Sequence, residues 1–343
     1  MAQFKNTTIN DTGFLQLPSG TIAQRPATAQ QGQMRFNTTL GSVEWYDSEY
    51  SAWFPTGFVP PAATGGTVTD ITQGGVNYRV HSFTTVGTNT FTVTRSGPVE
   101  FLIVAGGGSG GVGNSSGSCV AGSGGGAGGI LTGTKLINAG NFLITVGQAG
   151  QSQTQGSLQG NNGENSNAFG FTAIGGGGGG CRGGSADGAL PGKSGGSGGG
   201  GNHAVSAIAG SGTPGQGNSG GHGFDGGGCL PGTGGGAGFP GQPGFRDVEN
   251  AGGKGLYFGN LFTENFGENG FFAGGGAAGI NGSNLFSRGG LGGAVDQPLS
   301  RVTPNPGLPN SGAGGCGGAS GGEGFTPSGA GGSGIVLIRY RIS

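Results

Sequence analysis

Glycine recurs at every third position through long stretches of this chain, and no other feature restricts its fold so strongly. Ninety-three of the 343 residues are glycine, most of them between residues 105 and 334, and clear series run through residues 192–201 and 312–324. A polyproline II helix has three residues per turn and no internal hydrogen bonds, so each series would lie on one face of such a helix. The pattern predicts a bundle in which glycine faces allow close approach and neighbouring segments satisfy each other's backbone groups.

Flexible linkers and collagen are two other kinds of chain that are rich in glycine. Glycine and serine tracts usually behave as flexible linkers, but here apolar, strand-like segments lie at both ends of the glycine region and inside it. Collagen also needs glycine at every third position, as in residues 238–244, yet that register is not sustained and only 16 prolines are present. A packed polyglycine bundle is therefore favoured.

The composition argues against several kinds of partner. Only 8% of the residues are charged and the net charge is -1, so no electrostatic surface for nucleic acid or an anionic membrane is expected. No apolar run reaches the roughly 18 residues that a membrane-spanning helix needs. The polar residues 1–10 lack the apolar stretch of a secretory signal. We therefore expect no nucleic acid partner, no membrane insertion and no cofactor.

The cysteines all lie within glycine-rich stretches. No two of them form a C-x-x-C pair suited to zinc or redox chemistry. Small buried side chains are the expected role, and disulfides between adjacent segments are the alternative, with three connectivities open. The four residues are Cys119, Cys181, Cys229 and Cys316.

Composition divides the chain into three regions. Residues 1–58 contain three short alternating runs that predict a β-meander. Residues 59–75 have the proline, alanine and glycine of a linker, and residues 76–343 form a glycine-rich domain. Because the small N-terminal sheet can bury little core, we expect it to pack against a partner.

Predicted strands bracket the glycine region. They lie within residues 76–104, at 142–146 and at 335–342, and no segment shows a sustained 3.6-residue period. In the last strand Arg339 and Arg341 alternate with apolar residues, which predicts one buried face and one wet face. The predicted fold class is all-β plus polyglycine II, with almost no α-helix.

Four short motifs follow one another along the glycine-rich region. They are Phe-Leu-Ile-Val-Ala-Gly-Gly-Gly at 101–108, Phe-Leu-Ile-Thr-Val-Gly at 142–147, Asn-Gly-Glu-Asn-Ser-Asn-Ala-Phe-Gly at 162–170 and Gly-Ile-Val-Leu-Ile-Arg-Tyr at 334–340. In this order they resemble the glycine-rich domain of phage tail-fibre adhesins, a polyglycine II sandwich, and more distantly the glycine-rich region of the anaplastic lymphoma kinase receptors. The resemblance covers about residues 76–343. It implies that loops joining the glycine helices at the distal end recognise the host.

A second resemblance lies near the N-terminus. Leu-Pro-Ser-Gly-Thr-Ile-Ala-Gln-Arg-Pro at 17–26, Gly-Gln-Met-Arg-Phe-Asn at 32–37 and Val-Glu-Trp-Tyr at 43–46 are similar to a module of tailed-phage fibre and appendage proteins. There the module lies near the attachment end, which implies that residues 1–58 bind other virion proteins. A homotrimer through residues 1–58 is one expectation, because fibre proteins are commonly trimeric, although glycine-lattice tips of the resembled type can be monomeric.

No catalytic arrangement is visible. Residues 187–194 end like a phosphate-binding loop, but Asp187 replaces its first glycine and no buried strand precedes it. His81, His203 and His222 have no recognisable nucleophile or metal-ligand spacing, and the acidic residues are scattered. We therefore expect neither nucleotide binding nor enzymatic activity, and no metal site.

The stretch most typical of a binding surface interrupts the glycine pattern at residues 245–272. It is rich in aromatic and charged residues, which anchor many protein interfaces. By analogy with the resembled adhesins it is a candidate recognition loop, and packing of its phenylalanines among themselves to cap the lattice carries equal weight. The candidate receptor-binding residues are Arg246, Asp247, Glu249, Lys254, Tyr257, Phe258, Phe262 and Phe266.

A second candidate loop spans residues 285–310. It contains several prolines together with Arg288, Asp296 and Arg301, which are the candidate contacts. Proline stiffening lowers the ordering cost of binding, which suits a recognition loop. A plain surface connection is the alternative.

Together these features predict a virion appendage protein, a tail fibre or fibre tip that recognises a host surface glycan or outer-membrane protein through loops on the lattice. It would be assembled in the host cytoplasm and act outside the cell, leaving by lysis or attached to a particle. A purely structural virion role, as a head fibre, decoration protein or filament subunit, is the main alternative. Ice binding by a flat polyglycine face is a remoter one, because the aromatic insert would interrupt such a face.

Overall fold

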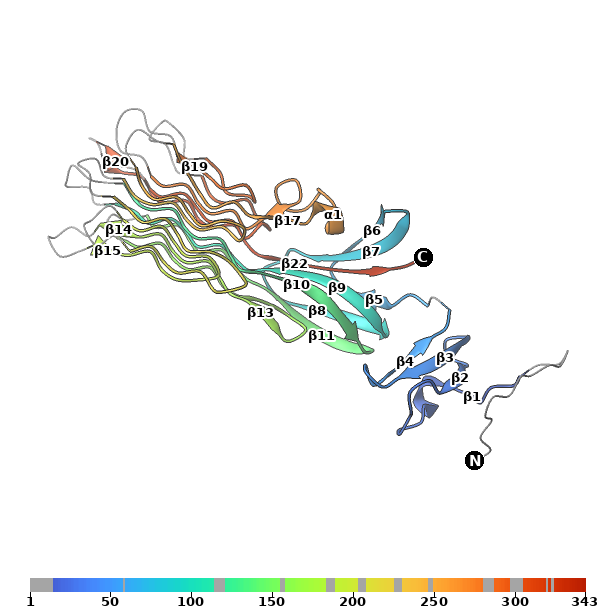
Figure 1. Ribbon diagram of the computed structural model, residues 1–343. Helices are drawn as coiled ribbons and strands as arrows, with labels where there is room; N and C mark the ends of the chain where they lie inside the picture. Colours follow the sequence, from blue (N-terminus) through green and yellow to red (C-terminus); the bar gives the residue numbers. More distant parts are fainter. Residues whose placement is uncertain are drawn as a thin grey trace. The chain divides into compact units, whose positions relative to one another are not determined.

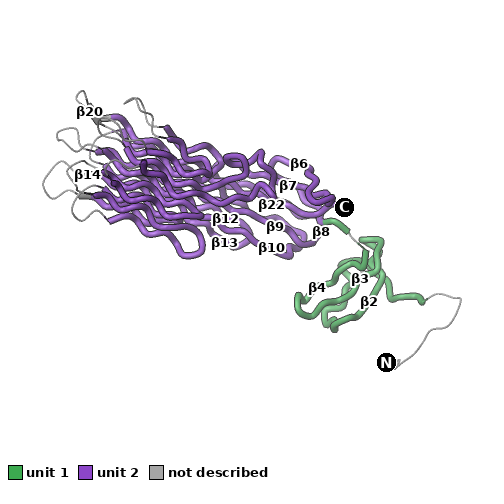
Figure 2. The backbone as a smooth tube through the Cα atoms, turned by 45° about the horizontal axis from the view of Figure 1, so that its top comes forward, with its two compact units in different colours: residues 1–60, 343 green, residues 61–342 purple. Residues whose placement is uncertain are grey.

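The chain, in a computed structural model, forms two compact units (Figure 2). The N-terminal unit comprises residues 1–60 with Ser343, and the glycine-rich unit comprises residues 61–342. The structure describes residues 15–57, 59–113, 121–154, 158–182, 189–202, 208–224, 230–245, 249–279, 287–296, 305–318, 320–321 and 324–343.

The N-terminal unit is built on one small sheet. β2 (Met34–Asn37), β3 (Ser42–Asp47) and β4 (Ala52–Pro55) form an antiparallel meander, as the three alternating runs predict. β1 (Ser19–Gly20) adds a parallel strand beside β2, and a single 3-10 turn, Ile22–Gln24, follows it.

The glycine-rich unit contains two five-stranded sheets (Figure 1). The β22 sheet has the order β10-β9-β22-β7-β6, with β6 (Thr67–Gln73), β7 (Val76–Phe83), β9 (Gly97–Val104), β10 (Ile130–Ile137) and β22 (Ile335–Arg341). The β8 sheet has the order β13-β12-β11-β8-β5, with β5 (Ala62–Thr64), β8 (Gly87–Arg95), β11 (Gly140–Val146), β12 (Ser166–Ala168) and β13 (Phe171–Ala173).

The two sheets share one apolar core. Phe83, Phe101 and Ile338 of the β22 sheet pack in the same cluster as Phe91 and Ile144 of the β8 sheet, and all five side chains are at most 2% exposed. The sheets therefore form a sandwich. The predicted all-β class is confirmed, and the described residues contain one short α-helix, α1 (Gly259–Phe262).

Two sequence predictions about the strands need correction. The segment 59–75 is not a linker, because β5 and β6 lie in it and pair with β8 and β7. β6 is largely exposed along its length, as an edge strand can be, and so lacks the apolar alternation that identifies a half-buried strand. β10, inside the glycine region, was not predicted from its sequence.

A short segment, residues 256–273, covers the outer face of the β22 sheet and is called the cover segment here. It contains β17 (Leu256–Tyr257), α1 and β18 (Phe271–Phe272), with β17 paired to β18 (Figure 1). Phe262 and Phe272 are fully buried in a second apolar cluster with Leu102 and Leu337 of the sheet. Both faces of the central strands β9 and β22 are therefore packed where the cover segment lies over them.

This covering explains a further correction. The alternation in the last strand predicts that Arg339 faces water, yet Arg339 is only 4% exposed. Its guanidinium forms an ion pair with Glu100, donates to Gln73 Oε1 at 2.6 Å and to the Leu261 carbonyl, and lies 4.2 Å from the centre of the Tyr78 ring. Arg341, the next residue on the same face of β22, is exposed as predicted.

Beyond the sandwich, glycine segments run side by side and are joined by backbone hydrogen bonds. The N–H groups of residues 105–112 donate in turn to three neighbouring segments, residues 121–129, 158–164 and 329–332, with N···O distances between 2.9 and 3.1 Å. Every third N–H group therefore reaches the same segment. This repeat is the three-residue period that the glycine spacing predicts.

The carbonyl groups of the same segment reach further neighbours. They accept from residues 176–179 and 315–318, again three residues apart, and from Gly150. Residues 105–112 are thus hydrogen-bonded to six surrounding segments. Residues 121–129 are likewise hydrogen-bonded to six segments that surround them. The glycine segments form a lattice held by peptide groups rather than by side chains.

The lattice spacing leaves no room for a side chain at most of these glycines. A Cβ added at Gly107 would lie 1.9 Å from the Ala313 carbonyl oxygen, and one at Gly234 would lie 1.8 Å from that of Gly125. Ser109, Ala127 and other small residues, all fully buried, occupy the positions that do have space. Glycine at the remaining positions is a steric requirement of packing.

The lattice has a far end, opposite the sandwich strands β6 and β7 (Figure 1). Short strand pairs mark it: β14 (Cys181–Arg182) with β15 (Ala189–Leu190), β16 (Asn250–Ala251) with β19 (Ser287–Arg288), and β20 (Ser320–Gly321) with β21 (Gly324–Phe325).

Candidate recognition surface

The aromatic residues proposed from the sequence as receptor contacts lie in the cover segment. Phe262 is fully buried, and Phe258 and Phe266 are half-buried and pack against the same apolar cluster. Phe262 is therefore not available to a partner in this structure. The arrangement matches the alternative in which the phenylalanines pack among themselves, although they cover a sheet face rather than the lattice end.

The polar members of the insert near the cover are partly engaged. The Tyr257 hydroxyl donates to Glu264 Oε1 at 2.9 Å, and the Lys254 ammonium lies 5.1 Å from the centre of the Phe271 ring. The hydrogen bond to Glu264 raises the pKa of Tyr257 above its ordinary value. Tyr257 lies in the cover segment and Lys254 lies just before it, away from the far end.

Two candidate residues from different loops meet at the far end. β16 pairs with β19 in parallel, so Glu249 and Arg288 lie side by side and form an exposed ion pair. Asp296 accepts a hydrogen bond from the Gly289 N–H at 3.0 Å, next to Arg288. Arg246, Asp247 and Arg301 lie outside the described residues.

The far end also carries large apolar side chains that the sequence analysis did not single out as contacts. Leu190, Ile208, Phe224 and Phe245 are 37%, 61%, 49% and 48% exposed, and the Phe224 and Phe245 rings lie 6.2 Å apart. We call these four residues the far-end apolar row. Their signal in the sequence is a single large apolar residue within a glycine tract.

Hydrogen bonds place the four segments of the row next to one another. The Ile208 carbonyl accepts from the Gly192 N–H, two residues after Leu190, at 3.0 Å. Nδ1 of His222 accepts from the Ala209 N–H at 3.5 Å, and the His222 carbonyl accepts from the Gly244 N–H at 2.8 Å. The row therefore crosses neighbouring segments in order and exposes apolar surface at a single edge of the lattice.

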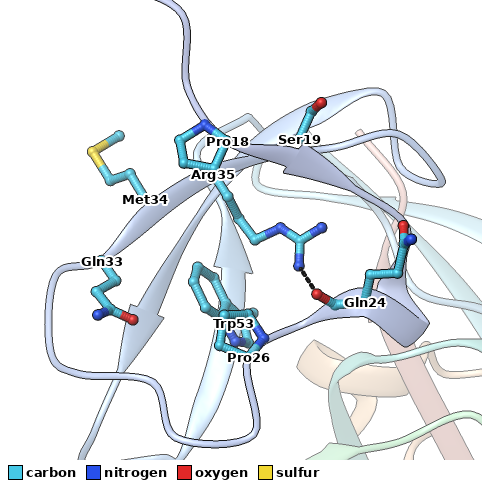
Figure 3. Close-up of a pocket in the computed structure, with 8 residues that line it drawn as sticks. All are labelled: Pro18, Ser19, Gln24, Pro26, Gln33, Met34, Arg35 and Trp53. Carbon is cyan, nitrogen blue, oxygen red and sulfur yellow. Dashed lines mark hydrogen bonds between the residues drawn. The ribbon is translucent and has the colours of Figure 1, made fainter.

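A hollow in the N-terminal unit offers no free charged group (Figure 3). Its volume is about 380 Å³, and Trp53, Pro26 and Arg35 are among the residues that line it. Arg35 Nη1 donates to the Gln24 carbonyl at 2.8 Å, and Nη2 donates to the Thr21 carbonyl at 3.2 Å. The guanidinium therefore serves the fold of its own loop.

Of the described histidines and cysteines, His81, Cys181 and Cys316 are buried, whereas His222 is exposed. His81 is fully buried in the sandwich, with Nδ1 2.7 Å from the Gly65 carbonyl and Nε2 3.1 Å from the Tyr340 hydroxyl, and burial lowers its pKa. Cys181 and Cys316 are free, buried thiols. Cys119, Cys229 and His203 lie outside the described residues.

The motif at residues 187–194, which ends like a phosphate-binding loop, is described from residue 189 onward, and residues 189–194 belong to the lattice. Lys193 donates its N–H to the Gly178 carbonyl and accepts from the Gly199 N–H, each at 2.9 Å. Within the described part of the chain, no group of three or more His, Cys, Asp or Glu residues could hold a metal ion, and no helix could cross a membrane.

Comparison with known protein families gives a match over most of the chain. Residues 84–341 match the family model of a glycine-rich domain. No curated protein matched the sequence. The matched range runs from just before β8 through β22, so it includes strands of both sheets as well as the whole lattice.

Proposed function

This chain belongs to the family of glycine-rich domains, and on that premise we propose that it is a virion appendage protein, a phage tail fibre or fibre tip that recognises the host surface. The far-end apolar row carries the proposal. Contiguous exposed apolar side chains, especially aromatic ones, are typical of interaction sites on otherwise polar surfaces. Here they stand on a backbone lattice that holds them in fixed relative positions.

The contact surface in this proposal is the far end rather than the cover segment. The row supplies apolar contacts, and the Glu249–Arg288 pair and Asp296 supply polar groups beside them. A surface of both kinds suits a glycan, whose sugar rings pack on aromatic side chains, or an outer-membrane protein. Because the lattice is already ordered, binding would cost little conformational entropy in the scaffold.

The proposal assigns the virion as the place of action and residues 1–58 as the attachment module to other virion proteins. Several copies on one particle would convert weak single contacts into avidity. It requires no catalytic residue, cofactor, nucleic acid or membrane insertion. A purely structural virion role is the outcome if the far end has no binding activity.

The test is binding of purified protein to a panel of candidate host cells. Phe224→Ser with Phe245→Ser is expected to weaken binding at least about tenfold, since truncating a central aromatic contact often costs more than 1 kcal/mol. Leu143→Ser is the matched control, because Leu143 is 68% exposed on β11, far from the row in the fold. Circular dichroism must show all three proteins folded.

Equal loss of binding in the control and the double variant would contradict a specific site at the far end. Binding by no protein to any cell in the panel would favour the structural role. A loss caused instead by Tyr257→Ser, with the double variant unaffected, would return recognition to the aromatic insert at residues 245–272.

A further inference from the structure

The hollow of the N-terminal unit offers no free charge to a ligand (Figure 3). Among the described residues that line it, Arg35 alone is charged, and it is only 5% exposed. Each nitrogen of its guanidinium faces an oxygen of the same unit: Nη1 the Gln24 carbonyl, Nη2 the Thr21 carbonyl, and Nε the Glu44 carboxylate at 3.5 Å. An anionic ligand would find no free cation there, so an uncharged ligand fits better.

The two glutamines that line the hollow already use their oxygens within the unit. Oε1 of Gln24 accepts from the Thr21 N–H at 2.9 Å, and Oε1 of Gln33 accepts from the Gln30 N–H at 3.2 Å. The main-chain carbonyls of both glutamines accept hydrogen bonds as well, each at 2.8 Å. The acceptors at these two positions are therefore engaged by the protein itself.

The donors in the same lining have no such partners. Among the described residues, nothing accepts a hydrogen bond from Nε2 of Gln24, Nε2 of Gln33 or the indole N–H of Trp53. Trp53 is half-buried, and the Arg35 guanidinium lies 6.0 Å from the centre of its ring. Amide NH₂ and indole N–H groups can only donate. The lining therefore suits a ligand that brings acceptors and few donors.

Ring surfaces make up much of the remaining lining, from Pro18, Pro26 and Trp53 (Figure 3). A polyproline II segment matches both properties. It has no internal hydrogen bonds, so its carbonyls are free to accept, and its prolines have no N–H to donate. Proline-rich segments dock in aromatic-lined grooves in this way. A sugar fits less well, because each of its hydroxyls donates as well as accepts.

We propose that the hollow binds a proline-rich segment of another protein in the polyproline II conformation. Its rings pack on Trp53 and Pro26, and its carbonyls accept from the side-chain amides of Gln24 and Gln33. Such a segment is ordered before it binds, so little conformational entropy is lost. In the proposed appendage it would belong to the virion protein that holds residues 1–58. That assignment to the virion rests on the proposed function, whereas the peptide site does not.

Isothermal titration calorimetry of the full chain with a capped decaproline peptide tests the proposal. The wild type is expected to bind with a dissociation constant below about 1 mM, and a glycine-serine decapeptide is expected not to bind. Gln33→Glu should weaken binding at least about tenfold, because it removes the donor but keeps an oxygen that can accept from the Gln30 N–H.

Gln31→Glu is the matched control for this variant. Oε1 of Gln31 likewise accepts from a backbone N–H, that of Ser48, but Gln31 does not line the hollow. The control adds the same charge two residues away and should bind decaproline as the wild type does. No binding of decaproline by the wild type, or equal binding by the wild type and Gln33→Glu, would overturn the proposal.

Tryptophan fluorescence locates the bound peptide. The chain has two tryptophans, and Trp45 and Trp53 belong to successive cross-strand pairs, so their side chains lie on opposite faces of the sheet. Decaproline is expected to change the emission of Trp45→Phe, which retains Trp53, and to leave that of Trp53→Phe unchanged. A change in Trp53→Phe alone, or a response to methyl glucoside but not to decaproline, would refute the site. Neither titration involves host cells, so the peptide site and host recognition can fail separately.

Discussion

Replacing Gly107 by alanine tests whether the lattice depends on glycine for steric reasons. Gly107 lies in residues 105–112, the segment with six hydrogen-bonded neighbours. The new Cβ would lie 1.9 Å from the Ala313 carbonyl oxygen, about 1.5 Å closer than ordinary van der Waals contact allows. The obstacle is backbone held by its own hydrogen bonds, so no side-chain rotation relieves it.

The cost follows from the bonds that must give way. Two bonds join residues 105–112 to residues 312–318, from Gly315 to Gly108 and from Gly318 to Gly111, each 2.9 Å long. Losing a buried backbone bond costs roughly 1–3 kcal/mol, so separating these segments costs about 4 kcal/mol. Alanine returns about 0.4–1 kcal/mol by restricting the unfolded chain. The net loss is about 3 kcal/mol.

Thermal unfolding followed by circular dichroism measures this loss. For a domain of this size, about 3 kcal/mol corresponds to a fall in Tm of about 5 °C. Gly133→Ala is the control, because Gly133 lies in β10 and its added Cβ would meet only the Phe101 ring, at 3.2 Å. If Gly107→Ala melts within about 2 °C of both the wild type and this control, the steric account of the lattice is wrong.

Three further predictions concern the sandwich, its cover and the thiols. Arg339→Met should destabilise the fold by about 2–3 kcal/mol, by removing a buried cation and its bonds to Gln73 and Leu261, and should speed protease cleavage within the cover segment; unchanged cleavage would count against this role. Burial lowers the pKa of His81 below 6.5, so the unfolded chain takes up its proton first, and stability should fall as pH drops below about 6.5. Tm measured from pH 7.5 to 5 should show a smaller fall in His81→Gln. Burial raises the pKa of Cys181 and Cys316 to about 12, so iodoacetamide at pH 8 should modify them only after denaturation, as peptide mass spectrometry would show.

The regular parts of the fold were predictable because their signals are local. The three-residue glycine spacing corresponds directly to the three-residue repeat of hydrogen bonds around residues 105–112. The apolar pattern of residues 76–83 likewise gives the bounds of β7. The position of Arg339 was not predictable in this way. Its burial depends on the cover segment, which lies more than 60 residues away in sequence.

The candidate site was harder to predict for a related reason. Residue type identified the aromatic insert as a binding surface, but the burial of Phe262 depends on where that segment folds back onto the sheet. The far-end apolar row depends on the order in which glycine segments pack, because the segments of Ile208 and Phe245 come to lie on either side of the segment of His222 only through the lattice. Since every segment has nearly the same repeat, the sequence alone does not say which segments adjoin.

The backbone lattice has a consequence for how stability changes with temperature. Unfolding of an ordinary domain exposes apolar surface, which raises the heat capacity, whereas exposure of peptide groups lowers it. The lattice buries peptide groups and few apolar side chains, so its unfolding should increase the heat capacity by less than the usual 12–15 cal/mol/K per residue. A smaller increase flattens the stability curve. The free energy that holds the glycine segments together should therefore vary little between cold and warm surroundings.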